Sequence, residues 1–226
     1  MSQEETKKNN SIAIAIIGLI GTIATAVFGS PVLVEWIKSR QATQTPIVIT
    51  PSPAFTEQVL IFQEDFDNDT VSGFTYKGEW EVGKDKNNRV LESHSAGKAT
   101  FGPSDFGHGI VEFRVRLGKG GVAELNFRAR DGNSYTLQCS EDQLRLGFNE
   151  NGKFQPFSNE TSRALVFEED AWYLLRVEAR GSNIIVFVDN NRILSAIDEQ
   201  FEQGGLDLQV LSGSAAFDDV KVWELK

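Results

Sequence analysis

From residue 58 to the end of the chain, apolar and polar residues alternate with a period of two, in short runs separated by turn-forming dipeptides. Val111, Phe113, Val115 and Leu117, for example, alternate with charged residues. Successive side chains of a β-strand point to opposite faces, so each run predicts a strand with one apolar and one polar face. No helix of ordinary length is predicted in this region.

Further runs predict strands near residues 123–129, 135–139, 144–148, 173–180, 183–189, 192–197, 206–211 and 215–225. Asp131-Gly132 and Asn151-Gly152 are dipeptides that favour tight hairpin turns. About a dozen short strands without crossover helices indicate an antiparallel sandwich or barrel. We therefore predict an all-β fold made of two stacked antiparallel sheets.

The charge of the chain argues against nucleic acid as a partner. From residue 58 onward there are 18 Lys and Arg residues against 28 Asp and Glu residues. Phosphate binding requires a basic field, which this balance does not provide. Cys139 is the only cysteine, so the chain has no intramolecular disulfide and no cysteine-rich metal site.

A membrane anchor is predicted near the N-terminus. Asn9–Val34 is a run of 26 residues without a charge, longer than the roughly 20 apolar residues that a transmembrane helix needs. Residues 41–57 are rich in proline and threonine, a composition typical of an extended linker. We predict a cytoplasmic tail at 1–10, a transmembrane helix at 11–37, a linker at 38–57 and one folded domain at 58–226.

In this interpretation the chain is a single-pass membrane protein of the cell membrane, and its C-terminal domain lies outside the cytoplasm. The alternative is a cleaved signal peptide, because Lys7-Lys8, the apolar run and Ala24-Thr25-Ala26 resemble the three parts of one. The apolar run continues beyond that cleavage point, which favours the anchor.

Polar residues of the middle strands suggest a ligand-binding face. If these strands lie side by side, they present one surface that contains Glu112, Arg114, Arg116, Glu124, Asn126, Arg128, Arg130, Thr136, Gln138 and Arg145. Planar polar side chains on rigid strands suit sugar hydroxyls or carboxylates, and five arginines favour an anionic ligand. The alternative is a solvated surface with cross-strand Glu–Arg pairs.

Five segments resemble a known family. They are Ile61–Phe66, Gly78–Trp80, Ala171–Gly181, Val186–Asp189 and Ala216–Val222. Together they are similar to the concanavalin A-like lectin and glucanase superfamily, in particular to bacterial laminin-G-like domains of the 3-keto-disaccharide hydrolase-like group. The resemblance covers nearly all of 58–226. It implies a jelly-roll sandwich whose concave sheet face binds sugar, and that fold hosts lectins, hydrolases and adhesion modules.

The sequence contains no convincing catalytic constellation. The Glu-x-Asp-x-x-Glu pattern of laminarinase-type relatives is absent, and His94 and His108 are isolated in the sequence. No cofactor is predicted. A structural calcium site is the one metal site that the resemblance implies, with Glu64 or Asp65 approaching Asp218 or Asp219.

Three functions follow as hypotheses. The first is a surface-displayed, non-catalytic module that binds carbohydrate through Arg114, Arg116, Glu124, Asn126, Arg128, Arg130, Gln138 and Arg145. The second is an enzyme that acts on glycosides or keto-sugars. The third is an ectodomain that binds a protein or acts as a sensor.

Overall fold

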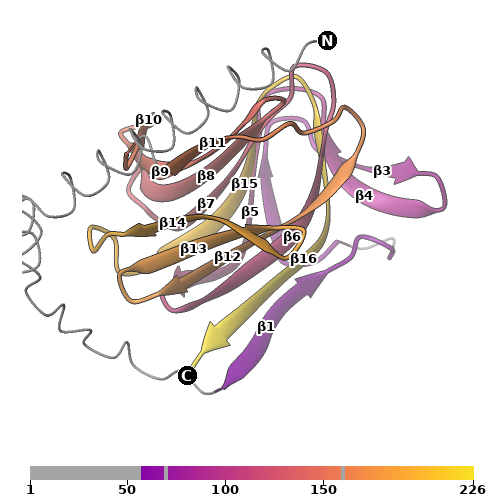
Figure 1. The fold of residues 1–226 in the computed structure, drawn as a ribbon. Coiled ribbons are helices and arrows are strands. Elements are labelled where there is room, and N and C mark those ends of the chain that lie inside the picture. The colour runs from indigo at the N-terminus through magenta and orange to yellow at the C-terminus, as the bar shows by residue number, and fades with distance from the viewer. Residues whose placement is uncertain (1–56, 69–70, 159–160) are drawn as a thin grey trace, which may run out of the picture. The chain divides into compact units, whose positions relative to one another are not determined.

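The computed structural model describes residues 57–68, 71–158 and 161–226, which form sixteen β-strands in two sheets (Figure 1). This architecture confirms the predicted all-β, two-sheet antiparallel sandwich. The predicted tail, transmembrane helix and nearly all of the linker lie outside the described residues, so these assignments stay predictions. Within the described part, no helix is long and apolar enough to cross a membrane.

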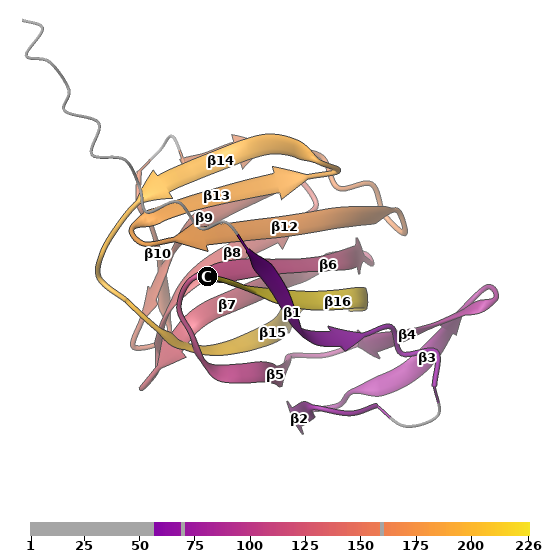
Figure 2. The ribbon, with the colours of Figure 1, turned by 90° about the horizontal axis from the view of Figure 1, so that it is seen from below.

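The first sheet, called sheet A, has eight strands. Its order is β14 (Asn191–Ile197), β13 (Asn183–Val188), β12 (Trp172–Arg180), β6 (Gly109–Leu117), β16 (Ala215–Leu225), β4 (Asn88–Ser93) and β3 (Glu81–Asp85). The eighth strand, β1 (Gln58–Glu64), pairs with the second half of β16 beyond β4. Figure 2 shows this sheet in front of the other.

The second sheet, sheet B, also has eight strands. Its order is β10 (Lys153–Pro156), β9 (Gln143–Glu150), β8 (Asn133–Ser140), β7 (Val122–Arg130), β15 (Gly204–Ser212), β5 (Gly97–Phe106) and β2 (Phe74–Lys77). A short strand, β11 (Ser162–Ala164), pairs with the start of β9. All of the pairings are antiparallel.

The core lies between the two sheets and is filled by the alternating apolar residues. Sheet A contributes, among others, Val111, Phe113, Val115, Leu175 and Val177, and sheet B contributes Leu125, Phe127, Leu137, Leu146 and Leu208. All of these side chains are buried. The polar residues between them therefore face outward from each sheet, and two different outer surfaces result.

The β7–β8 hairpin departs from simple alternation at its end. Phe127 pairs with Tyr135 and Arg130 with Asn133, so two residues of β7 oppose a single residue of β8. This is a β-bulge, and Arg128 has a φ of 52° within it. Asp131 and Gly132 follow with φ values of 53° and 81°, the two positive angles that the predicted hairpin turn requires.

Candidate functional site

The outer face of sheet B is hollowed into a polar groove of about 540 Å³. Strands β5, β7, β8, β9, β10 and β15 and the β7–β8 and β9–β10 turns line it. The lining residues are Lys98, Glu124, Asn126, Ala129, Arg130, Asp131, Gly132, Asn133, Ser134, Gln138, Asn149, Asn151, Gly152, Phe154, Asp207, Gln209 and Leu211. Several of these polar side chains, among them Glu124, Asn126 and Asp207, are buried although they face away from the core.

Asp207 and Asn126 form the centre of a hydrogen-bond network in this groove. Asn126 Nδ2 donates to Asp207 Oδ1 at 3.0 Å, and Gln209 Nε2 donates to the same oxygen at 2.8 Å. Lys98 Nζ lies 2.7 Å from Asp207 Oδ2. The strand register explains the cluster, because Asp207 on β15 is paired with Asn126 on β7 and with Thr100 on β5.

The amide oxygen of Asn126 accepts from three further side chains. Thr136 Oγ1 donates at 2.6 Å, Ser134 Oγ at 3.1 Å and Asn149 Nδ2 at 3.1 Å. The donors come from β8 and β9. The network thus connects four adjacent strands of the sheet, which fixes the positions of its polar atoms.

A second group lies along the same face. Gln138 Nε2 donates to Glu124 Oε1 at 2.6 Å, and Arg145 donates to the amide oxygen of Gln138. The guanidinium of Arg145 lies over the ring of Phe154, 4.8 Å from its centroid. Phe154 therefore places an aromatic ring on the polar face, beside a cation that binds to its π surface.

The carboxyl of Glu124 has a shifted pKa. Its residue is only 3 % exposed, and burial raises the pKa of its carboxyl above the ordinary value. Hydrogen bonds from Gln138, Asn149 and Asn126 oppose this shift, and the charge of Asp207 adds to it. The groove thus contains two buried carboxylates on neighbouring strands, one of which has a raised pKa.

The groove offers fixed amide, hydroxyl and carboxylate groups on rigid strands, with one exposed aromatic edge. Such groups donate to and accept from vicinal hydroxyls, and an aromatic ring packs against the apolar face of a sugar. The arrangement suits a hydroxyl-rich ligand. Its lining cations are paired, since Lys98 contacts Asp207 and Arg130 Nε lies 3.6 Å from Asp131.

The structure divides the predicted ligand-binding residues among three places. Glu124, Asn126, Gln138 and Arg130 line the groove, and Arg145 contacts Gln138 beside it. Arg114 and Arg116 belong to β6 and lie on the outer face of sheet A, as does Glu112. The expectation of one shared surface is therefore wrong, because strands β6 and β7 are consecutive in the chain but belong to opposite sheets.

On sheet A the arginines take part in the alternative pattern of cross-strand pairs. Arg116 Nη1 lies 3.4 Å from Asp85 Oδ1, and Trp172 Nε1 donates to the same carboxylate at 2.6 Å. The guanidinium groups of Arg114 and Arg116 lie 5.4 Å and 5.3 Å from the centroid of the Trp172 ring. Trp172 thus packs against this charged surface and is not in the groove.

Arg128 points into the interior, contrary to the sequence-based expectation. The bulge in β7 reverses the alternation, so that Ala129 lines the groove while Arg128 is only 2 % exposed. Its guanidinium group donates to the backbone carbonyls of Gly107, Gly181 and Phe201 at 2.7 to 3.0 Å. Each of its three guanidinium nitrogens thus donates to the backbone within the fold, which gives Arg128 a structural role.

Sequence reasoning missed the groove residues contributed by β5, β9 and β15, namely Lys98, Asn149, Asp207 and Gln209. A local signal existed for one of them. Asp207 lies between Leu206 and Leu208, which are both fully buried. An acid on the polar face of a central strand is a candidate for a ligand-binding residue. Its pairing with Asn126 depends on contacts between distant parts of the chain, which the sequence pattern does not specify.

The acids of the predicted calcium site have other partners. The Glu64 carboxylate accepts from the backbone amides of Phe66 and Ser72 at 3.0 Å and 3.1 Å. Asp218 Oδ2 accepts from Asn88 Nδ2 at 2.7 Å. Within residues 57–68, 71–158 and 161–226, the single group of three or more metal-ligating side chains is Glu81, Glu92 and His94.

Several solved structures share this fold at low sequence identity. The carbohydrate-binding module CBM66 from Bacillus subtilis has a TM-score of 0.56 and 20% identity, over 66% of this chain and 93% of that one. Domain 4 of AbnA, an extracellular arabinanase from Geobacillus stearothermophilus in complex with arabinotriose, has a TM-score of 0.57 and 11% identity, over 75% and 94%. A GH16 protein from Bacteroides ovatus, in complex with a product of mixed-linkage glucan, has a TM-score of 0.54 and 14% identity, over 71% and 99%.

These likenesses define a sandwich of the concanavalin A-like class. The sequence model of one protein family, the 3-keto-alpha-glucoside-1,2-lyase-like domain, matches residues 62–223, and the chain belongs to this family. The match confirms the resemblance found in the sequence. No curated protein sequence matches the chain.

Proposed function

We propose that the chain is a carbohydrate-binding module and that its ligand lies in the groove on the outer face of sheet B. The observation that carries this proposal is the network centred on Asp207 and Asn126, which holds donors and acceptors of four adjacent strands in fixed positions. The solved structures of similar fold include a carbohydrate-binding module and an arabinanase domain with a bound arabinose trisaccharide.

The groove favours a neutral, hydroxyl-rich ligand. The argument for an anionic glycan depended on five arginines sharing one face, but only Arg130 and Arg145 are at the groove. Glu124, Asp131 and Asp207 offset the cations that line it. A uronic acid would therefore gain no net attraction from this surface.

A glycan-array screen of the full-length chain tests the proposal. Asn149→Ala and Gln209→Ala each remove a partly exposed polar group from the groove, and each weakens binding by roughly threefold to tenfold. Arg114→Ala, on the outer face of sheet A, is the matched control and leaves the affinity unchanged. Failure of the intact chain to bind any glycan, together with capture of a protein ligand, would support a protein-binding ectodomain in its place.

The second candidate is an enzyme acting on sugar derivatives, and the pair Glu124 and Asp207 favours it. A buried carboxyl with a raised pKa beside a second carboxylate is an arrangement that serves general acid catalysis. Turnover of glycosides or 3-keto-glycosides by the intact chain, lost in Glu124→Gln and kept in Glu169→Gln, would establish this function. Glycan binding without turnover would leave the non-catalytic module.

We further propose that residues 11–37 anchor the chain in the cell membrane and that the linker 38–57 holds the sandwich outside the cytoplasm. The uncharged run Asn9–Val34 supports the anchor, and the proline-rich composition supports an extended linker. Protease added to intact cells would then degrade the sandwich while leaving cytoplasmic proteins whole. Protection of the sandwich until the cells are lysed would contradict this orientation.

A further inference from the structure

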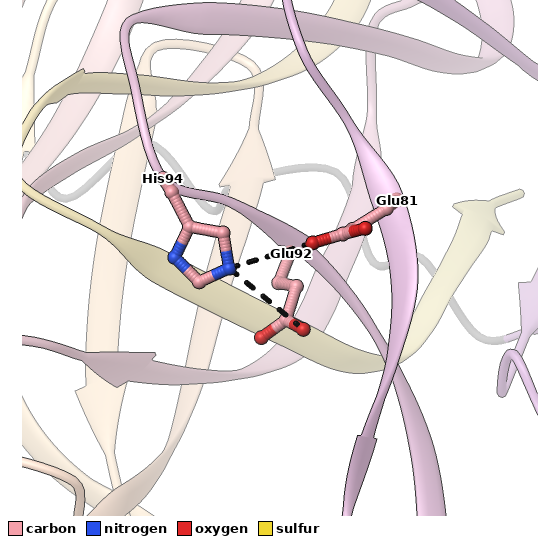
Figure 3. Close-up of side chains that lie close together, drawn as sticks. All are labelled: Glu81, Glu92 and His94. Atoms are coloured by element: carbon pink, nitrogen blue, oxygen red, sulfur yellow. Dashed lines mark ion pairs between the residues drawn. The ribbon is translucent and has the colours of Figure 1, made fainter.

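We infer that Glu81, Glu92 and His94 form a binding site for a divalent transition metal of the zinc class, separate from the groove. Figure 3 shows the three side chains converging, with both contacts made by one ring nitrogen of His94. His94 Nε2 lies 3.6 Å from Glu81 Oε1 and 4.0 Å from Glu92 Oε1. The three candidate ligand atoms all lie within 4.8 Å of one another.

The register of the β3–β4 hairpin brings these groups together. Glu81 on β3 is directly opposite Glu92 on β4, and His94 follows Glu92 by two residues, which places both on the same face. Like charges directly opposite each other destabilise a strand pair. A cation held between the two carboxylates converts this repulsion into attraction.

Two neighbours lie against the carboxylate of Glu92. A Cβ atom at Gly83 would lie 1.7 Å from Glu92 Oε1, so the carboxylate occupies space that only glycine leaves free on β3. The other oxygen, Oε2, lies 3.8 Å from the guanidinium of Arg116. Arg116 thus lies beside the second oxygen of this carboxylate, where supporting partners of metal-binding carboxylates commonly lie.

The ligand set and its spacing fit zinc better than calcium. Zinc bonds of about 2.0–2.2 Å in a tetrahedron place ligand atoms roughly 3.3–3.6 Å apart. The His94–Glu81 distance of 3.6 Å already falls in this range, whereas Glu92, at 4.0 Å from His94, would move closer when the ion binds. Calcium takes about six to eight oxygen ligands, and an imidazole nitrogen is a poor substitute for one of them. Three protein ligands leave one tetrahedral position for water.

A hollow of about 410 Å³ adjoins the three ligands and is lined also by Gly78, Glu79 and Trp80. It gives an ion access from solvent and leaves room for the water that would complete the coordination. Because the site joins β3, β4 and the residue after β4, a bound ion would fasten the edge hairpin of sheet A. A metal ion that binds the folded chain but not the unfolded chain raises the stability of the fold.

Calorimetric titration of the tag-free full-length chain with zinc chloride, alongside thermal unfolding, tests the site. We expect one zinc ion per chain and a melting temperature that rises with zinc concentration. Glu81→Gln and His94→Ala each remove a ligand, so each weakens zinc binding by more than the roughly tenfold that loss of a supporting partner costs. Glu79→Gln is the matched control: it makes the same charge change beside the site, keeps all three ligands, and binds zinc as the wild type does.

Cobalt(II) supplies an independent reading of the coordination. A four-coordinate site gives the chain an intense visible absorption band with cobalt, and His94→Ala abolishes that band while the β-sheet circular dichroism stays unchanged. Zinc binding by His94→Ala and Glu81→Gln that is as tight as in the wild type would mean an adventitious ion only and would overturn the proposal. Absence of saturable binding, or calcium binding as tight as zinc binding, would overturn it as well.

Discussion

Arg128 is a charged residue that holds one end of the sandwich together. Its guanidinium group donates to carbonyls of Gly107, Gly181 and Phe201, which belong to three different interstrand loops. Arg128→Ala would leave these carbonyls without their charged donor in a buried place. We expect the free energy of unfolding, measured by urea denaturation, to fall by about 3 kcal/mol.

Arg130→Ala is the matched control for this loss. Arg130 lies two residues away with a side chain 74% exposed, and it forms an ion pair with the exposed Asp131. Substitution of an exposed residue of this kind changes stability by within about 0.5 kcal/mol. Equal effects of the two substitutions would contradict the structural role of Arg128.

The buried carboxyl of Glu124 should make the stability of the fold depend on pH. Burial raises the pKa of this carboxyl in the folded state above the ordinary 4.5. At a pH between 4.5 and this higher pKa, the folded chain keeps a proton that the unfolded chain has released. Stability therefore falls as the pH rises through this window. The raised pKa of Asp218, also due first to burial, acts in the same direction.

Urea denaturation over a pH series checks this dependence. In Glu124→Gln the side chain is neutral at every pH, so the variant loses less stability than the wild type as the pH rises from 4.5 to neutrality. The exposed substitution Glu169→Gln should keep the wild-type slope. An unchanged slope in Glu124→Gln would contradict the raised pKa.

At the scale of elements, the hairpin of β9 and β10 determines where Phe154 lies. Gly147 on β9 is paired with Pro156 on β10, and a Cβ atom at Gly147 would lie 2.1 Å from the carbonyl oxygen of Gln155. Gly147→Ala therefore displaces β10 and costs about 1–3 kcal/mol of unfolding free energy. Lys153→Ala, which changes an exposed residue of β10, is the control. Gly152→Ala is unsuitable although a Cβ atom there would meet nothing, because the φ of 77° at Gly152 strains any other residue.

The same displacement should weaken glycan binding, because Phe154 and the β9–β10 turn line the groove. The glycan affinity of Gly147→Ala, measured on the folded fraction, separates this local effect from general unfolding. Wild-type affinity in that variant would show that β10 does not contribute to the ligand site.

Individual strands could be predicted from the sequence because their alternation is a local property. Val111 to Leu117 and Ala123 to Phe127 have the predicted faces, and the Asp131-Gly132 turn has the predicted positive φ values. The exception is Arg128, since a bulge inserts one residue and changes the face of those that follow. Nothing in a run of alternating residues marks where such an insertion occurs.

At the scale of the whole molecule, the assignment of strands to sheets depends on distant pairings. Consecutive strands β6 and β7 belong to opposite sheets, and β15 inserts between β7 and β5. The residues of the predicted site are therefore divided between the two sheets: the groove contains Glu124, Asn126 and Gln138, while Arg114 and Arg116 lie on the other sheet. Lys98 and Asp207 complete the groove only because strands far apart in the chain meet there.

The sandwich also closes on itself, since its first strand, β1, pairs with its last strand, β16. The buried core residues of the described part lie between Phe66 and Val222, so a chain that starts at residue 57 should fold without the first 56 residues. We expect this shortened chain to be soluble, with a β-sheet circular dichroism spectrum and one cooperative unfolding transition.

The full-length chain should sediment with membranes after high-salt washing, because the uncharged run Asn9–Val34 is retained. A shortened chain that also sediments with membranes would place the membrane contact in the sandwich, and a full-length chain that stays soluble would refute the anchor.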